Sequence, residues 1–427
     1  MPVTLPTKGE TLKPRNVNSI YPPSEFLRWS AIFTSHIGMF PSELLFSGNK
    51  LHQSVYELYS KIVVVYYIYI TISMFVALGY LLLENPVRMS EVFKNSTTTI
   101  LCATAIGRQF AMRVHPAFLK ILRFIVDSEQ DLMCTDDKKV LKLYFSYKNK
   151  ATFNSLFYLT MTYSLTLFYL LRPFVMDSNQ VLNGNDTITE LRSFPMSIWV
   201  PFDDQTYYWL AYAWNCINTL VMTSIVSSVD VLTLLLIIYP VSQLQILNHI
   251  LGNFEAYMGR IQALHNIQDS LVVGEMTFQA CIAAYRNIID YVDNLNACIS
   301  VFMVLDFAQS SVLFATVIAQ LLWNPPSFQF YGFVLLYLLY LNQRIFVLYY
   351  YSNEIWILSE NLSLFFWRCK WYDLSMKVKR MMTLFILRTR RPLRINIGPF
   401  GVMSLSTYIA ILKATYSYMT LLSSVKE

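Results

Sequence analysis

The chain has 427 residues, of which 55% are hydrophobic, 15% aromatic and only 14% charged, and its net charge is +6. A soluble protein has about 25% charged residues, so this chain has too little charge to cover itself in water. Most of its exterior is therefore expected to face lipid. The basic residues gather between apolar runs rather than among stacking aromatics, which argues against nucleic acid as a partner.

The residue types that carry enzyme chemistry do not occur in the patterns that such chemistry needs. The six cysteines are scattered, and no pair has the spacing of a metal site or a redox motif. The five histidines do not form an H-E-x-x-H motif, and the sequence has neither a phosphate-binding Walker loop nor a G-x-S-x-G motif. We expect no catalytic residue, no metal and no cofactor.

Seven segments are candidates for crossing a bilayer, which takes about 20 mostly apolar residues per helix. The segment 90–112 is the least apolar, and it is counted because the flanking loops otherwise fall on inconsistent sides of the membrane. Asn324-Pro325-Pro326 divides one long uncharged run into two antiparallel helices. The predicted spans are 62–83, 90–112, 151–171, 205–229, 293–323, 328–358 and 400–425. These predict an all-α membrane protein with seven transmembrane helices.

The side on which each loop lies follows from lysine and arginine, which accumulate in short cytoplasmic loops. The amino-terminal segment and the segments 113–150, 240–290 and 367–394 together hold 24 of these residues, and the opposite loops hold four. This asymmetry predicts an inverted topology, with the amino terminus inside and the carboxyl terminus outside. The sequon Asn185-Asp186-Thr187 then lies outside, and we expect Asn185 to be glycosylated.

An apolar stripe continues past the fourth span with alternating three- and four-residue spacing, and a second stripe precedes the fifth span. The two stripes predict a helical hairpin, which packs either within the chain or on other subunits in an assembly. A short amphipathic helix is expected near 374–391. The stripes consist of Leu244, Leu247, Leu251, Phe254, Met258 and Ile261, and of Tyr285, Ile288, Val292, Leu295 and Ile299.

The predicted organisation has six parts. They are a cytoplasmic amino-terminal segment (1–54), spans one to four with a ligand pocket (55–240), a cytoplasmic helical hairpin (241–292), spans five and six (293–367), a cytoplasmic helix (368–396) and a pore helix (397–427). Asp230 and Asp306 are lone charges in or near spans, so they are expected to face the protein interior as structural or gating partners.

Several motifs lie in the carboxyl-terminal half. They are Trp199-Val200-Pro201-Phe202-Asp203, Leu295-Asn296 through Ser310-Ser311, Ser359-Glu360-Asn361-Leu362, Arg391-Pro392-Leu393 with Gly398 and Phe400, and Ile411-Leu412-Lys413 with Tyr416-Ser417-Tyr418. Together they resemble the insect odorant receptor family over most of 195–425. The resemblance implies an odorant-gated, non-selective cation channel in the plasma membrane of olfactory neuron dendrites. It also implies a heterotetramer with the olfactory co-receptor Orco.

The family resemblance also selects candidate residues on the predicted spans. The last helix would surround the pore, with Met419, Leu422 and Ser423 at its gate, where an apolar ring can close a channel by dewetting. The pocket would lie in the outer half of spans two, three, four and six. Its candidates are Phe93, Thr97, Ile100, Thr162, Tyr163, Thr166, Tyr208, Ala211, Tyr212, Asn215, Leu335, Tyr337 and Leu338.

Three alternatives remain open at this stage. A gustatory receptor has a similar topology, but the ending Tyr416-Ser417-Tyr418 favours the odorant branch. A G-protein-coupled receptor also has seven spans, but its amino terminus is outside, which the basic-residue asymmetry opposes. A transporter would be expected to show internal repeats or paired broken helices, and the sequence has neither.

Overall fold

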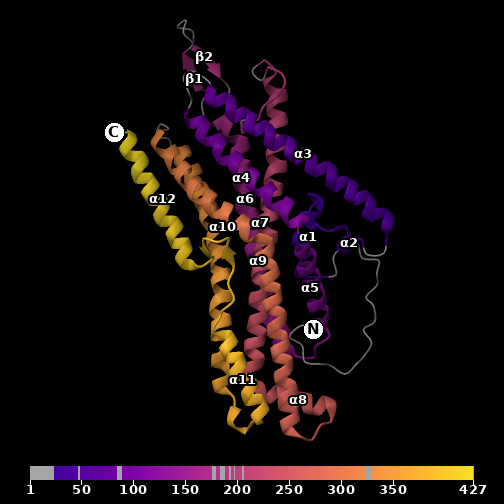
Figure 1. Cartoon of the computed structure of the whole chain (residues 1–427). Helices are drawn as coiled ribbons and strands as arrows, with labels where there is room; N and C mark the ends of the chain where they lie inside the picture. The colour runs from indigo at the N-terminus through magenta and orange to yellow at the C-terminus, as the bar shows by residue number, and fades with distance from the viewer. Residues whose placement is uncertain are drawn as a thin grey trace.

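The computed structural model describes residues 24–46, 49–83, 89–175, 179–182, 188–191, 194–196, 198–203, 206–323 and 328–426. Long helices lie side by side in a bundle (Figure 1). The seven longest in the described ranges are α3 (Lys50–Leu83), α4 (Met89–Val114), α6 (Lys138–Val175), α7 (Tyr208–Gly252), α9 (Ser270–Trp323), α10 (Phe328–Glu360) and α12 (Leu405–Lys426). Each of the seven predicted spans falls on one of these helices.

The remaining elements are short. They are α1 (Arg28–His36), α2 (Ser42–Leu45), α5 (Pro116–Met133), α8 (Phe254–His265), α11 (Met376–Thr389) and the 3₁₀ helices η1 (Asn361–Arg368) and η2 (Trp371–Asp373). Two antiparallel hairpins complete the described elements: β1 (Asn179–Leu182) with β2 (Ile188–Leu191), and β3 (Asn396–Ile397) with β4 (Gly401–Val402). The helix expected near 374–391 is α11. Sequence reasoning did not anticipate α1, α2 or α5.

Helix α7 forms the centre of the bundle and contacts α4, α6, α9 and α10. It therefore buries 83% of its most apolar 18-residue window, whereas α3 at the edge buries 28%. In the described residues, four helical segments are both long and apolar enough to cross a membrane: 50–83, 208–252, 270–318 and 331–364.

Helix α4 explains why the second span is the least apolar. Its polar residues Asn95, Thr97 and Thr99 are buried rather than exposed. The Asn95 side chain accepts a hydrogen bond from Thr99 at 2.8 Å, and Thr97 donates to Thr316 of α9 at 3.0 Å. Because these side chains are turned into the protein, where they bond within α4 and to α9, the segment needs no continuous apolar surface to lie in a bilayer.

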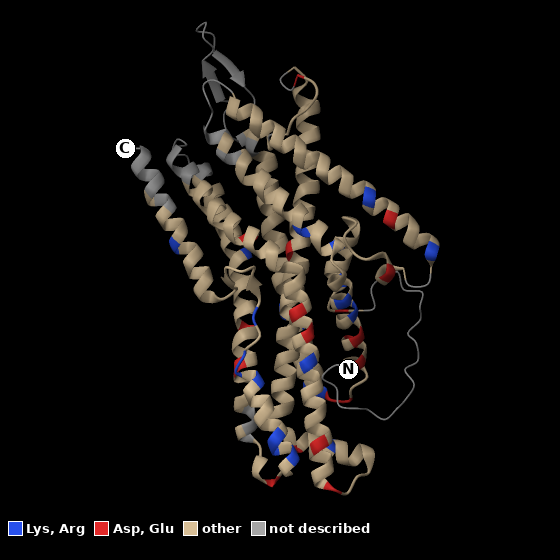
Figure 2. Ribbon diagram, in the orientation of Figure 1, with Lys and Arg blue, Asp and Glu red and all other residues tan. Residues whose placement is uncertain are grey.

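Helices α7 and α9 continue beyond the bundle into a lower part that also contains α8 and α11, and the charged residues are concentrated over this lower half (Figure 2). The predicted apolar stripes lie here. Leu244, Leu247 and Leu251 of α7 are fully buried within the single chain, and so are Leu295 and Ile299 of α9. The intrachain alternative therefore accounts for the stripes, which leaves little of them to contact another subunit. The first stripe also does not follow one helix, because α7 ends at Gly252 and α8 begins at Phe254.

The segment before α1 is fastened to α5 through one buried carboxylate. Glu129 is 2% exposed, and it accepts hydrogen bonds from the Ser24 hydroxyl and from the backbone N–H of Glu25 at 3.0 Å and Phe26 at 3.4 Å. Burial raises the pKa of Glu129 although these hydrogen bonds oppose it. The region 24–46 is thus a folded part of the bundle and not only a leader to the first span.

Candidate ligand-binding site

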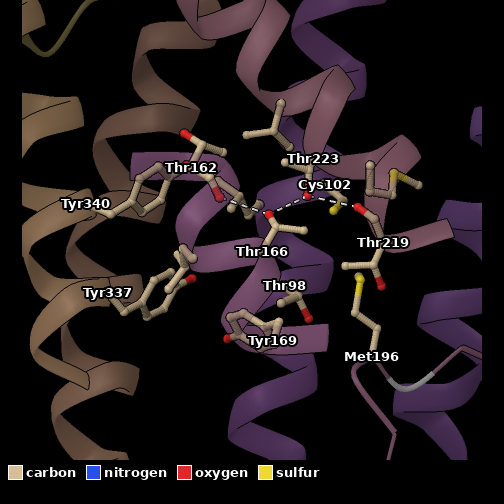
Figure 3. Close-up of a pocket in the computed structure, with 14 residues that line it drawn as sticks. Thr98, Cys102, Thr162, Thr166, Tyr169, Met196, Thr219, Thr223, Tyr337 and Tyr340 are labelled. Atoms are coloured by element: carbon tan, nitrogen blue, oxygen red, sulfur yellow. Dashed lines mark hydrogen bonds between the residues drawn. The ribbon is translucent and has the colours of Figure 1, made fainter. Parts of the chain in front are cut away.

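A cavity of about 70 Å³ lies inside the upper bundle, between α4, α6, α7 and α10 (Figure 3). Met196, from the segment before α7, closes one side. The cavity is mostly apolar, and its polar atoms come from hydroxyl groups. Its lining residues are Thr98, Leu101, Cys102, Thr162, Leu165, Thr166, Tyr169, Met196, Thr219, Met222, Thr223, Val226, Tyr337 and Tyr340.

Threonines from two facing helices form one wall. A helical threonine can donate its hydroxyl hydrogen to the carbonyl four residues earlier, as Thr162 does to Tyr158 at 2.8 Å and Thr219 to Asn215 at 2.7 Å. The hydroxyls of Thr166 and Thr223 lie 2.9 Å apart and join α6 to α7. Because these hydrogens are already used, the wall offers a ligand methyl groups and acceptor lone pairs.

Tyrosines from α10 form the opposite wall. The rings of Tyr337 and Tyr340 stack with their centroids 6.0 Å apart and an interplanar angle of 5°. Tyr169 meets Tyr337 edge-on at 6.4 Å. The Tyr337 hydroxyl has no hydrogen-bond partner among the described residues, so it is a lining group with a hydrogen left to donate to a ligand.

A cluster of four charged side chains lies directly beyond Tyr340, and each of the four is at most 4% exposed. Arg344 of α10 contacts Asp230 of α7 at 2.8 Å and also contacts Asp306 of α9. Arg108 of α4 lies 2.6 Å from Asp230 and 3.8 Å from Asp306. Buried charges are tolerated only where they are paired, and here two positive and two negative groups balance.

This cluster corrects the view of Asp230 and Asp306 as lone charges, although both do face the interior as expected. Sequence reasoning missed Arg344. The available signal was an arginine near the middle of the predicted span 328–358, which is costly in lipid unless it has a buried partner. Among the described residues, no group of three or more His, Cys, Asp or Glu could hold a metal ion.

The model of the family described as "7tm Odorant receptor" matches residues 88–416. The chain belongs to this odorant receptor family. The family consists of ligand-binding receptors rather than enzymes, and its seven-helix membrane fold is the one that α3, α4, α6, α7, α9, α10 and α12 build here.

Two kinds of relative agree with this assignment. Odorant receptor 10 of Aedes albopictus is 27% identical over 183 residues, which are 43% of this chain and 44% of that receptor. Odorant receptor 30a of Drosophila melanogaster is 25% identical over 39% of this chain and 43% of that receptor. The chain thus aligns with less than half the length of each. The olfactory receptor OR5 of Machilis hrabei, solved alone and with eugenol, has the same fold with a TM-score of 0.71 at 16% identity, covering 93% of this chain and 97% of OR5.

Three of the predicted pocket residues line the receptor's cavity, namely Thr162, Thr166 and Tyr337. On α7 the prediction chose Tyr208, Ala211, Tyr212 and Asn215, but the cavity lies deeper along that helix, at Thr219, Met222, Thr223 and Val226. Tyr208, Ala211 and Asn215 are instead buried in packing, and Tyr212 donates to the Leu170 carbonyl at 2.8 Å. The cavity residues of α7 repeat the predicted spacing but lie 11 positions further along the helix, which is about three turns.

The remaining predicted residues lie on other faces of their helices. Leu335 is 60% exposed, and Tyr163 is 36% exposed with its hydroxyl 3.2 Å from Ser224 of α7, so neither lines the cavity. Thr97 is turned to Thr316 of α9, while its neighbour Thr98 lines the cavity. Ile100 and Leu338 are half-buried and are not part of the lining. The side chains of Phe93, Met419, Leu422 and Ser423 lie outside the described part of the structure, as does Asn185.

Proposed function

We propose that this receptor is the odour-tuning subunit of a ligand-gated cation channel, and that a small neutral volatile binds in the cavity between α4, α6, α7 and α10. The observation that carries the proposal is the cavity itself, which is apolar and built mainly from four helices. Such a site suits a ligand that buries most of its surface and is oriented by a few polar groups. The Tyr337 hydroxyl would donate to an oxygen of the ligand.

The size of the cavity supports gating by the ligand. Its volume of about 70 Å³ is roughly half of the about 150 Å³ that an engineered apolar cavity needs to hold benzene. A volatile of benzene size or larger fits only if the walls move apart. A ligand shifts a conformational equilibrium only through its differential affinity for two states, and a cavity that must expand provides that difference.

The proposal extends to the assembly and the membrane. The receptor would join the co-receptor Orco in a heterotetramer in the dendritic plasma membrane of olfactory neurons, with α12 lining a pore for cations. Charged residues concentrated over one end of the bundle support an orientation with that end in the cytoplasm. The parts 1–54, 241–292 and 368–396 would then be cytoplasmic. Mapping glycosylation at Asn185 tests this orientation against that of a G-protein-coupled receptor.

The test is co-expression with Orco and current recording against a panel of volatiles that includes eugenol. Met222→Ala, which enlarges the cavity, is expected to lower the half-maximal concentration of larger volatiles by about fourfold for each extra methylene that the cavity then buries, since one buried methylene is worth about 0.8 kcal/mol. Leu220→Ala lies two residues away, but Leu220 is 44% exposed, so it is the matched control and should change nothing. Equal effects of the two variants would contradict the proposed site.

Tyr337→Phe refines the ligand class in the same assay. The variant keeps the aromatic wall and removes the unpaired hydroxyl. An alcohol, ketone or ester is expected to lose about three- to tenfold in apparent affinity, which matches a net hydrogen bond of about 0.5–1.5 kcal/mol. The corresponding hydrocarbon should be unaffected. An equal loss for both compounds would rule out Tyr337 as the polar contact.

A further inference from the structure

The buried charge cluster is connected to the cavity wall by two tyrosines. The Tyr158 hydroxyl of α6 donates to Asp230 at 2.7 Å, and it lies 3.1 Å from the Tyr340 hydroxyl. A tyrosine hydroxyl has one hydrogen, and Tyr158 gives its hydrogen to the carboxylate. Tyr340 must therefore donate to Tyr158, and the two hydroxyls form a directed chain that ends on Asp230.

Tyr340 contacts both the cavity and this pair of hydrogen-bonded hydroxyls. It lines the cavity, while its hydroxyl points into the cluster, and its ring stacks on that of Tyr158 at 5.8 Å. Any ligand that widens the cavity on the α10 side must displace Tyr340 or the helix that carries it. Displacement removes the hydrogen bond to Tyr158 and changes how firmly Tyr158 holds the Asp230 carboxylate.

The cluster has room for a second arrangement. A small void of about 10 Å³ adjoins it, lined by Tyr158, Asp230 and Arg344 among others, which is close to the volume needed for one water molecule. The Nη1 atom of Arg344 and the Oε1 atom of Gln343 are buried there without a hydrogen-bond partner. Arg108 contributes charge, but none of its N–H groups has hydrogen-bond geometry to a described partner. Unused donors and free volume allow the guanidinium groups to change partners.

Helix α9, which carries Asp306 of the cluster, also contacts the segment that leads into α12. Asp306 lies on α9, and six residues earlier the Ser300 carbonyl of α9 accepts a hydrogen bond from the Gly398 N–H at 2.9 Å. Gly398 has a left-handed backbone with φ of +49°, and a Cβ at this position would lie 2.5 Å from Val304 of α9. The turn before α12 is therefore packed closely on α9, on a face of that helix different from the one that carries Asp306, and α12 itself contacts α9 and α10.

We propose that Tyr340 and Tyr158 form a relay that transmits filling of the cavity to the Arg108–Asp230–Asp306–Arg344 cluster. The cluster holds α4, α7, α9 and α10 in the resting arrangement. Displacement of Tyr340 loosens Asp230, Arg344 changes partners, and α9 shifts the turn that carries α12. This inference rests on the proposed channel function for its output, whereas the relay itself is a property of this chain alone.

Tyr158→Phe is the decisive variant, because Tyr158 lies outside the cavity lining and its loss removes no ligand contact. In cells that express the receptor with Orco, the maximal response to a volatile, as a ratio to the response to a direct co-receptor agonist, is expected to change at least threefold. Tyr163→Phe is the matched control. Tyr163 is five residues away on α6 and exposed, and its hydroxyl lies 3.2 Å from that of Ser224. The relay is overturned if the two variants give the same ratio.

Arg344→Lys provides an independent variant. Lysine keeps the charge but lacks the planar fork by which arginine contacts two carboxylates at once. Its resting current relative to the agonist-evoked current is expected to rise at least twofold, because α7 and α9 lose the Arg344 bridge and keep only Arg108 between their carboxylates. A resting current equal to that of the wild type would contradict the role of the cluster.

A measurement without any volatile separates the relay from the channel function. In the purified full-length receptor, the thermal stabilities of Tyr340→Phe, Asp306→Asn and the double variant form a cycle. These residues do not contact each other directly, so additive effects are expected unless the relay couples them. Coupling equivalent to at least a threefold change in the unfolding equilibrium supports the relay even if no volatile opens a channel. Additivity overturns it even if the receptor responds to odours.

Discussion

Helices α3 and α7 are similarly apolar, but they occupy opposite environments. The most apolar window of α7 is 83% buried inside the protein, and that of α3 is 28% buried. Hydropathy identifies both as membrane-length helices, because lipid and protein interior accept the same side chains. It does not distinguish which neighbour each helix meets. Composition therefore indicates that the bundle lies in lipid. Packing decides which helices line the cavity and hold the buried charges.

The largest expected effect is the loss of packing in α7. Ile237→Ala removes a fully buried side chain and is expected to destabilise the receptor by about 2–5 kcal/mol, as measured by thermal unfolding in detergent. Ile72→Ala on α3 is the matched control, since Ile72 is 57% exposed and its removal leaves no cavity inside the protein. Similar losses for the two variants would mean that α3 is covered by another subunit.

A charge on α3 sharpens the comparison further. The exposed face of α3 should meet lipid, so Ile72→Lys near the middle of the predicted first span is expected to cost about 2.5–3.5 kcal/mol. Surface expression should fall for Ile72→Lys and stay normal for Ile72→Ala. If lysine were tolerated, this face of α3 would border water and the assignment of the first span would have to change.

The fold could be predicted from the sequence more completely than the cavity. The seven helices follow from run length and from the Asn324-Pro325-Pro326 break, and the weak second span was placed correctly although its polar face is buried. The site was predicted only in part. A helical face can be chosen from spacing, as Thr162 and Thr166 show, but depth along the helix depends on tilt and on neighbours. Tyr208 and Thr219 lie on the same face of α7 and are equally plausible pocket residues from sequence. Only the neighbouring helices determine that Thr219 lines the cavity.

The buried charged residues also show that packing partners cannot be read from one segment. Asp230 and Asp306 were expected to be interior, yet their partners could not be assigned, because Arg108 and Arg344 come from two other spans. Burial cost shows that a partner must exist, but it does not identify the partner. The contact is determined by how four helices are rotated in the bundle, which no single segment encodes.

A smaller effect is expected where α8 contacts Asp137, in the segment before α6. Burial raises the pKa of Asp137, but hydrogen bonds from Tyr257, the Lys139 backbone and Arg260 outweigh it and lower the pKa below its usual value. The ionised form is therefore favoured in the folded state. Its stabilisation is present above the unfolded pKa of about 3.9 and is lost as the pH falls through the lower folded value.

Asp137→Asn tests this contact with a pH series. At pH 7 the variant is expected to be less stable by about 1–3 kcal/mol, because Tyr257 and Arg260 lose a charged acceptor. The difference from the wild type should shrink as the pH falls below about 4, where the wild-type carboxylate also becomes protonated. A difference that stays constant over the series would assign the effect to packing. Thermal unfolding in detergent over the pH series gives both quantities.

The smallest effect is expected for a substitution at Gly79 of α3. A Cβ added to Gly79 would meet nothing within 4 Å, which agrees with the loosely covered face of this helix. Gly79→Ala is therefore expected to stabilise the receptor slightly, by about 0.5–1 kcal/mol, because alanine favours helix and fills open space. Gly398→Ala should do the opposite, since a left-handed backbone and a 2.5 Å approach to Val304 both oppose a side chain. If Gly79→Ala were also destabilising, a neighbouring subunit would have to pack against α3 at this point, and the contrast between an outer helix and a central one would apply to the single chain only.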